Sequence, residues 1–593
     1  MGAFFLFNSD EPVDRDGVRA VFQRKGFTAP EEFSLGRMTL WLYRKQLVDE
    51  PNHLVADAGT AVFATGTVVY KGKPYAETLR TLLEDFRAGC LDQEELIGSF
   101  CLIFFADNRL SILTDRFNVH HVYLTEDGRR LSSSFLAVLA SHRGPLPLNR
   151  LALYEKMSTG CVVGPDTLVS GVLQLTDGVR VRAGEDGYCF IPHAPRPGAV
   201  EFCTAGREAC VEHQVSVLRR YFERIGPLAQ RYAPELGLSS GYDSRLVLCL
   251  GKLLPVPLAA HTHWTLGVHE REKAIVELLS GVYGNPLRVV PSRRLEQHVE
   301  EDLAAILDDN VYYFDGRCGH DMGAYSETYT RKYRIEVLGD NRLSLSGLGG
   351  EIYRNYCFSS RKRVRFRDWM KHHVGFQVAD RIISSRDVKE ETWRHVLRKT
   401  SEILDADLSG TVDRFTTRRY FAEVRTPQSN GVNHGAHNQL TFYLTPFAEP
   451  SVVREAYRAT PWIGLSGRFE AAMIARLDKR VADMPSHYGF PLTREPASHA
   501  LYALLKGYVP DWLWLLRRRL VRNTTRRGVE ELRGYREFVR RSRRMQEIDA
   551  AWRDYAPEID LSWCVRDPFC KWNVVSVGSL LREFQSRIRV ETA

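Results

Sequence analysis

One turn constrains this chain more than any other stretch: Leu238-Ser239-Ser240-Gly241-Tyr242-Asp243-Ser244-Arg245. A short apolar run that starts at Ala233 precedes the turn, and an apolar helical pattern that starts at Leu246 follows it. A strand, a tight turn and a helix in this order place backbone N–H groups at a helix N-terminus, where phosphate oxygens bind. We therefore expect residues 238–244 to bind the phosphates of a nucleotide.

The carboxylate within this turn indicates what accompanies the phosphate. Asp243 would repel a phosphate group unless a divalent cation lay between the two, so the turn predicts ATP with Mg²⁺. The hydroxyls of Ser239 and Ser244 add donors and acceptors at the same point. The G-x-x-x-x-G-K-[ST] loop of other nucleotide-binding proteins does not occur in the sequence.

The turn resembles the pyrophosphate-binding loop S-G-G-x-D-S of ATP pyrophosphatases, and within that group it is most similar to the asparagine synthetase family. One residue departs from the pattern, because Ser240 stands where the family has its second glycine. A side chain is tolerated there unless the backbone needs a positive φ or must approach the phosphates closely. The alternative is an ordinary strand-to-helix turn with serine caps.

A second motif, Ser346-Gly347-Leu348-Gly349-Gly350-Glu351, resembles the family's S-G-x-G-x-D-E. The resemblance implies that the backbone at Ser346 and Gly347 approaches the nucleotide. It also implies that Glu351 joins Asp243 as a catalytic carboxylate and Mg²⁺ ligand.

From about residue 202 short buried strands alternate with helices, which is typical of an α/β domain with a parallel sheet. Strands are expected over 233–238, 257–262, 287–290 and 342–346. Ligands of such sheets bind beyond the carboxyl ends of the strands. We therefore expect both motifs and Thr262, at the end of a third strand, to meet at one edge and bind ATP.

A third segment, which begins Arg468-Phe469-Glu470, resembles the family's K-x-x-L-R run. Arg468 stands at or near the position of the family's catalytic lysine, and it completes the predicted catalytic set with Asp243 and Glu351. An arginine can neutralise the charge of pyrophosphate or of an acyl adenylate. It is a poor proton shuttle, because it keeps its proton.

Residues 1–191 are rich in strand-like runs, and five short motifs follow the order found in the glutaminase domain that opens asparagine synthetases. Among them are Leu96-Ile97-Gly98-Ser99-Phe100 and Thr114-Asp115-Arg116. The resemblance implies an N-terminal-nucleophile fold, an αββα sandwich. In the family the second residue is a nucleophilic cysteine, whereas Gly2 has no side chain. We expect the glutaminase to be inactive and the domain to act as a scaffold.

The chain divides by composition into three parts. A chain of 593 residues is too long for one core. A Pro/Gly-rich stretch at 192–201 predicts a linker between the glutaminase-like domain and an asparagine-synthetase-like ATP-binding domain of the HUP type at 202–504. Residues 505–593 are expected to form a basic helical extension, either a helical cap on the preceding domain, which we favour, or a surface for a precursor peptide or another anionic partner.

Charge distribution and cysteine usage indicate which partners and which cellular compartment to expect. Between Arg517 and Arg544 twelve arginines face three glutamates, so the net charge of +8 is mostly local and no nucleic-acid partner is expected. Eleven scattered cysteines contain no C-x-x-C pair, which favours reduced thiols over disulfides or zinc. No apolar run reaches membrane-spanning length, and a cytoplasmic location is expected.

Together these features predict an ATP-dependent ligase that adenylates a carboxylate, releases pyrophosphate and transfers the acyl group to an amine. Without a glutaminase, the amine is free ammonia or belongs to a small-molecule or peptide substrate, as in β-lactam synthetases and lasso-peptide cyclases, which this chain resembles. Three alternatives stay open: asparagine synthesis from ammonia, macrolactam cyclisation of a peptide, and a non-catalytic nucleotide-binding scaffold or peptide-binding maturation subunit. The oligomeric state also stays open, a homodimer included.

Overall fold

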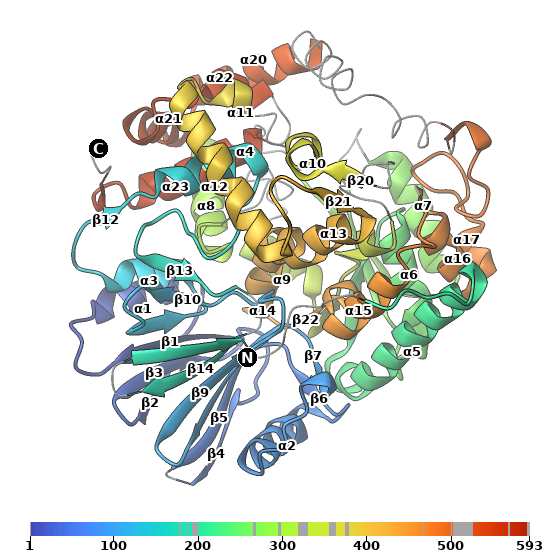
Figure 1. Cartoon of the computed structure of the whole chain (residues 1–593), viewed down its shortest axis with the longest axis horizontal. Coiled ribbons are helices and arrows are strands. Elements are labelled where there is room, and N and C mark those ends of the chain that lie inside the picture. Colours follow the sequence, from blue (N-terminus) through green and yellow to red (C-terminus); the bar gives the residue numbers. More distant parts are fainter. Residues whose placement is uncertain are drawn as a thin grey trace.

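Two antiparallel sheets form the N-terminal part of the computed structural model (Figure 1). The first has the order β13 (Val172–Gln174), β10 (Tyr123–Thr125), β11 (Arg130–Ser132), β1 (Ala3–Asn8), β3 (Met38–Tyr43), β2 (Glu31–Leu35). The second has the order β15 (Gly187–Pro192), β14 (Val179–Gly184), β9 (Arg109–Thr114), β8 (Phe100–Ala106), β5 (Thr60–Gly66), β4 (His53–Asp57). The structure describes residues 2–57, 59–176, 179–184, 187–192, 200–264, 269–293, 298–317, 330–354, 363–373, 379–464, 466–499, 501, 526–566 and 570–589.

Alternate side chains of each strand in this part lie on opposite faces of the sheet and so belong to different core layers. Along β1, Phe4 and Leu6 belong to the core between the two sheets, whereas Phe5 and Phe7 belong to the core under α1 (Arg15–Arg24) and α3 (Phe135–Ser141). The far face of the second sheet packs on α2 (Tyr75–Arg87). Helices therefore cover both outer faces of two stacked sheets, the four-layer order that was predicted.

A five-stranded parallel sheet lies at the centre of the next part, with the order β18 (Leu287–Pro291), β17 (Ala259–Trp264), β16 (Pro234–Gly237), β19 (Leu343–Leu345), β22 (Phe442–Leu444). The four predicted strands are confirmed, and β22 was missed. One face packs on α5 (Arg207–Tyr232), α6 (Tyr242–Leu250), α7 (Glu270–Gly281), α15 (Pro450–Arg458) and α16 (Arg468–Leu477). The other face lies against α9 (Arg331–Leu338) and α14 (Gly431–Asn438).

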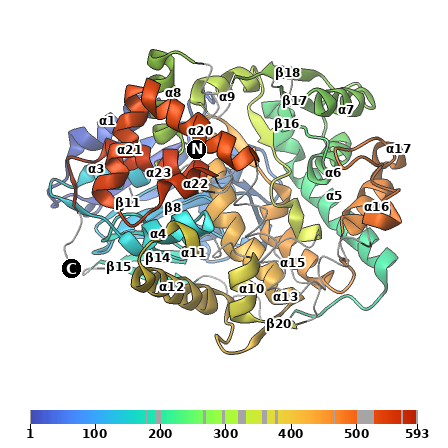
Figure 2. The same cartoon turned by 90° about the horizontal axis from the view of Figure 1, so that it is seen from above.

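Four C-terminal helices pack as part of the body rather than as a separate arm: α20 (Arg526–Arg541), α21 (Arg543–Tyr555), α22 (Leu561–Arg566) and α23 (Lys571–Glu583) (Figure 2). Their buried side chains, such as Met545 and Trp552, share one core with α4 (Arg150–Thr159) and α8 (Glu300–Tyr313). The predicted helical pattern at 511–519 and most of the predicted linker lie outside the described residues.

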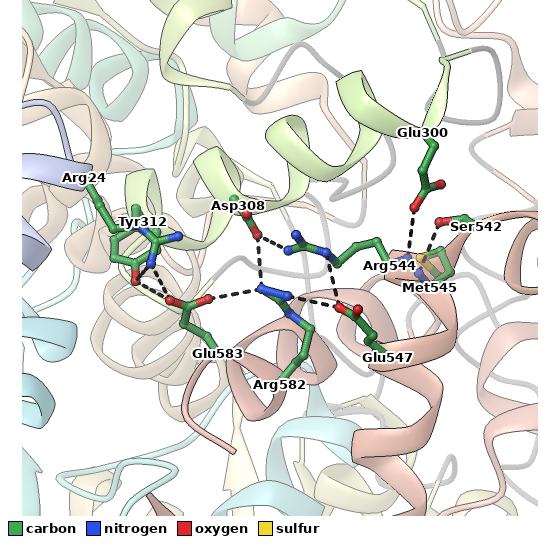
Figure 3. Close-up of polar contacts among 10 residues, drawn as sticks. All are labelled: Arg24, Glu300, Asp308, Tyr312, Ser542, Arg544, Met545, Glu547, Arg582 and Glu583. Atoms are coloured by element: carbon green, nitrogen blue, oxygen red, sulfur yellow. Dashed lines mark hydrogen bonds and ion pairs between the residues drawn. The ribbon is translucent and has the colours of Figure 1, made fainter. Parts of the chain in front are cut away.

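Ion pairs fasten these helices to α8 (Figure 3). Arg582 on α23 lies 3.4 Å from Asp308 on α8 and 3.2 Å from Glu547 on α21. Arg544 also pairs with Asp308, and Arg24 on α1 pairs with Glu583. Part of the local arginine excess is thus used inside the structure.

The remaining elements connect these parts: β6 (Val69–Tyr70), β7 (Leu96–Ile97), β12 (Leu146–Pro147), β20 (Arg363–Arg365), α10 (Phe366–His373), α11 (Ala379–Ile382), α12 (Arg386–Leu404), β21 (Thr411–Asp413), α13 (Arg414–Arg419), a π-helix (Tyr420–Asn430), α17 (Lys479–Ala482) and β23 (Ile588–Arg589), with short 3₁₀ turns at Gln93–Glu95, Gly251–Leu253, Gly350–Tyr353 and Pro446–Ala448. In the part of the chain that the structure describes, we find no helix with the length and apolar character needed to cross a bilayer.

Candidate functional site

The serine-rich turn leaves β16 and enters α6, with Gly241 as the residue before the helix. Its two hydroxyls hold the turn together. The Ser239 N–H donates to Ser244 Oγ (3.1 Å), and Ser244 Oγ donates to the Ser239 carbonyl oxygen (3.0 Å). The Gly241 N–H donates to Ser239 Oγ (3.3 Å). Ser239 is exposed and Gly241 is half-buried, so a ligand can reach this end of the helix.

Ser240, the residue that departs from the family pattern, fits without backbone strain, because it does not have a positive φ. Its backbone N–H and its hydroxyl both donate to Glu272 Oε1 on α7, each at 3.3 Å. The hydroxyl also lies 3.2 Å from His487 Nδ1. The Glu272 carboxylate therefore accepts the hydrogen bond of the Ser240 N–H, one of the backbone donors that the turn would offer to a phosphate.

The two motifs meet at the carboxyl edge of the sheet, because β16 and β19 are parallel neighbours. Glycines make the contact close. A Cβ on Gly347 would lie 2.9 Å from the Ser244 nitrogen, and one on Gly350 would lie 2.1 Å from Asp243 Oδ1. On the other side of β16, the Leu238 N–H donates to His261 O (2.8 Å), which places Thr262 beside the turn. The structure thus brings together the three segments expected at this edge.

An arginine that the motifs did not single out lies at the centre of this arrangement. Arg354 Nη2 donates to both oxygens of Asp243, at 2.7 and 2.6 Å. Its Nε lies 3.1 Å from Glu470 Oε2, and Nη2 lies 3.8 Å from Glu351 Oε1. One guanidinium therefore lies among three carboxylates, from the turn, from the second motif and from α16.

Burial and neighbouring charges shift the pKa values of Glu470 and Arg354 in this cluster. Glu470 is fully buried, and burial together with the nearby Asp243 raises its pKa well above the usual range. Burial works to lower the pKa of Arg354, but Glu470, Asp243 and Glu351 outweigh it and raise that pKa. The arginine stays charged, and the glutamate favours its neutral form.

Mg²⁺ does not fit the carboxylates as they are packed here. The ion needs oxygen ligands at about 2.0–2.1 Å in near-octahedral geometry. Both oxygens of Asp243 instead accept hydrogen bonds from Arg354. Asp243 and Glu351, the predicted ligands, are close together, but a guanidinium lies with them.

Arg468, the third predicted catalytic residue, has a different neighbour. Its Nε lies 2.6 Å from Glu495 Oε2, and 56% of its side chain is exposed. Gly467, just before it, packs under the ring of Tyr242, where a Cβ would lie 2.4 Å from Cζ. The start of α16 therefore lies at the turn, but it is Glu470 rather than Arg468 that reaches Arg354.

The surroundings of Gly2 leave no room for a nucleophilic side chain. A Cβ on Gly2 would lie 2.4 Å from the carbonyl oxygen of Arg44. The adjacent cavity measures about 20 Å³, enough for about one water molecule, and Lys25, Asp315 and Arg317 line it. Lys25 Nζ pairs with Asp315 at 2.7 Å. The residues around Gly2 thus pair with one another instead of enclosing a glutamine-sized space.

Comparisons with known proteins identify no family. No protein-family model and no curated protein matches the sequence. Among solved structures, glutamine phosphoribosylpyrophosphate amidotransferase from B. subtilis, complexed with ADP and GMP, is similar at 9% identity and a TM-score of 0.23, over 49% of this chain and 90% of that chain. An allosteric regulatory enzyme of purine biosynthesis is similar at 9% identity and a TM-score of 0.22, over 49% and 80%. At this level neither structure bears on the function of the chain.

Proposed function

We propose that this chain is an ATP-dependent ligase of the asparagine synthetase type, which adenylates a carboxylate and passes the acyl group to an amine. One observation supports the proposal above all others. The serine turn after β16 and the glycine-rich acidic turn after β19, far apart in sequence, pack against each other at the carboxyl edge of a parallel sheet.

Bound ATP would supply the electrophilic phosphorus and the pyrophosphate leaving group. The chain's own residues bind and position. Ser239 and the N-terminus of α6 offer hydroxyl and N–H donors, and Glu272 must leave the Ser240 N–H before a phosphate oxygen can take its place. Gly347 and Gly350 let the second turn lie against Asp243. Rate enhancement would come from orientation and electrostatics more than from proton transfer.

The amine does not come from glutamine hydrolysed by this chain. The position of Gly2 carries no nucleophile, and the cavity beside it holds about one water molecule. Free ammonia, or an amine on a small-molecule or peptide substrate, would attack the activated acyl group.

ATP–pyrophosphate exchange tests this proposal, with a panel of amino acids, small carboxylic acids and peptides as carboxylates that accept the adenylyl group of ATP while pyrophosphate leaves. We expect exchange with at least one carboxylate, and we expect Gly347→Ala to abolish it, because the new Cβ would meet the Asp243–Ser244 backbone. Gly144→Ala is the matched control, since a Cβ there meets nothing within 4 Å. Absence of ATP binding by the wild type would refute the proposal.

A non-catalytic nucleotide-binding scaffold is the second candidate, and two contacts favour it. Arg354 binds both oxygens of Asp243, and Glu272 lies on the Ser240 N–H. Both contacts lie where a working site would meet its substrate. Tight ATP binding without exchange for any carboxylate would select this candidate over the ligase.

A further inference from the structure

We infer that Arg354 takes the place and the charge of the divalent cation that Asp243 and Glu351 would otherwise hold. A nucleotide phosphate at this edge is then met by a guanidinium, and its binding does not require a metal ion. The inference rests on the proposed nucleotide binding at the serine turn, and it assigns to that site a cation that is part of the chain.

The contacts of Arg354 are those of a cation that stays bound between the acidic side chains. Nη2 binds both oxygens of Asp243, and Nε lies 3.1 Å from Glu470, which is fully buried. Removing the cation from this cluster leaves the half-buried Asp243 carboxylate without its ion-pair partner, which is unfavourable. A metal ion would have to expel the guanidinium before it could reach the oxygens of Asp243.

The guanidinium still has donors to offer. Nη2 donates to Asp243 and Nε lies 3.1 Å from Glu470 Oε2 without a hydrogen bond, while among the described residues Nη1 meets the Tyr488 hydroxyl only at 3.5 Å. The side chain remains 19% exposed. Arginine binds phosphate oxygens through pairs of parallel N–H donors, and its charge does not depend on pH. Nη1 can therefore donate to a phosphate while Nη2 holds Asp243.

The ring of Tyr242 supports this placement. The Arg354 guanidinium carbon lies 5.5 Å from the ring centroid of Tyr242, a residue of the serine turn itself. The arginine is thus attached to the turn through an ion pair at Asp243 and through an aromatic contact at the preceding residue, Tyr242. Its position is set by the turn that would bind the nucleotide.

The first experiment measures ATP affinity by isothermal titration calorimetry in EDTA and in excess Mg²⁺. For the wild type we expect the two dissociation constants to agree within about threefold. For Arg354→Met we expect binding in EDTA to weaken by about tenfold or more, since a charge-assisted contact is lost, and Mg²⁺ to restore part of it. Arg476→Met is the control, because that arginine is on the same helix as Glu470, is 63% exposed and pairs with Glu212.

The second experiment measures Mn²⁺ binding without nucleotide, by electron paramagnetic resonance. We expect no site at this edge in the wild type and a new site in Arg354→Met, lost again when Asp243→Asn is added. Arg354→Met/Glu470→Gln, which leaves no uncompensated buried charge at position 470, serves if the single variant fails to fold. ATP binding that requires Mg²⁺ in the wild type, or no gain of Mn²⁺ binding in either variant, would overturn the inference. If the wild type binds no ATP in either condition, the proposed function fails, and the Mn²⁺ result alone decides the role of Arg354.

Discussion

Replacing Lys399 by methionine should loosen the contact between the N-terminal part and α12. The ammonium of Lys399 lies 2.5 Å from Glu155 on α4 and 2.8 Å from Asp166. His395, one turn earlier on α12, also pairs with Asp166, at 2.9 Å. Lys399 is 5% exposed and Glu155 is fully buried. Asp166 keeps a partner in the variant, whereas Glu155 loses its cation.

The free-energy cost of Lys399→Met follows from the burial of Glu155. Removing one partner of a buried ion pair costs about 3–5 kcal/mol, because the remaining charge stays away from water. Burial already raises the pKa of Glu155, and Lys399 opposes that rise. Without Lys399 the folded-state pKa rises further above the unfolded value. The stability that a protonated Glu155 retains at low pH is then lost as the pH rises through that pKa, so the variant should be more destabilised at pH 8 than at pH 5.

Hydrogen–deuterium exchange suits this chain, because a protein with several cores need not unfold in one step. Peptides from α4 and α12 should exchange roughly a hundred- to a thousandfold faster in Lys399→Met at pH 8, since about 1.4 kcal/mol corresponds to tenfold. The control is Arg398→Met, whose partner Glu402 is exposed and whose loss should cost about 0.5 kcal/mol or less. Adding Glu155→Gln should recover much of the loss. Equal exchange in the two single variants would refute the reasoning.

Three further predictions concern other parts of the chain. Burial raises the pKa of Glu449 to about 8, so the wild type loses stability as the pH rises from about 4.5 towards 8. The melting temperature of Glu449→Gln should therefore rise relative to that of the wild type across this pH range. A constant difference between the two melting temperatures would contradict this. Gly2→Cys should release no glutamate from glutamine and should melt at a lower temperature, because its Cβ meets Arg44 O at 2.4 Å; measurable glutaminase activity would disprove this. Arg582→Met should speed limited proteolysis of α20–α23 by a few-fold, an effect that the exposed Arg553→Met should not show.

The strands of the parallel sheet could be predicted because each is an apolar run that ends at a turn or a polar residue. β18 extends the expected strand at 287–290 by one residue, and the expected strand at 342–346 contains β19. The strand β22 was missed for a physical reason. Phe442–Leu444 is only three residues long, and its order comes from pairing with β19 rather than from its own pattern.

The candidate site could be predicted only as far as its contiguous motifs. Ser239, Gly347 and Glu351 lie in short runs with turn residues at fixed spacing, and a parallel sheet brings such runs to one edge. Arg354 lies outside these runs, and although Glu470 lies in the third segment, its contact with Arg354 requires α16 to fold back onto the turn. The hydrogen bond between Ser240 and Glu272 could not be predicted from the sequence either, because Glu272 lies on the helix that follows another strand.

Among the residues that the structure describes, two clusters have the composition of metal sites, and a basic side chain lies within each. Glu155, Asp166 and His395 offer ligand atoms within 4.8 Å of one another, yet the ammonium of Lys399 binds two of them. Asp243, Glu351 and Glu470 surround Arg354 in the same way. Buried carboxylates need a cation, but the charge requirement alone does not say whether the cation is an ion or a side chain.

In both clusters the basic side chain is close in sequence to one of the carboxylate or imidazole groups. Lys399 follows His395 by four residues on α12, and Arg354 follows Glu351 by three residues, just after the 3₁₀ turn Gly350–Tyr353. In both clusters the basic group reaches the acidic side chains from the chain itself. Charge supplied by the chain is permanent, and this is why the metal dependence of nucleotide binding, rather than the presence of carboxylates, distinguishes this site from a magnesium site.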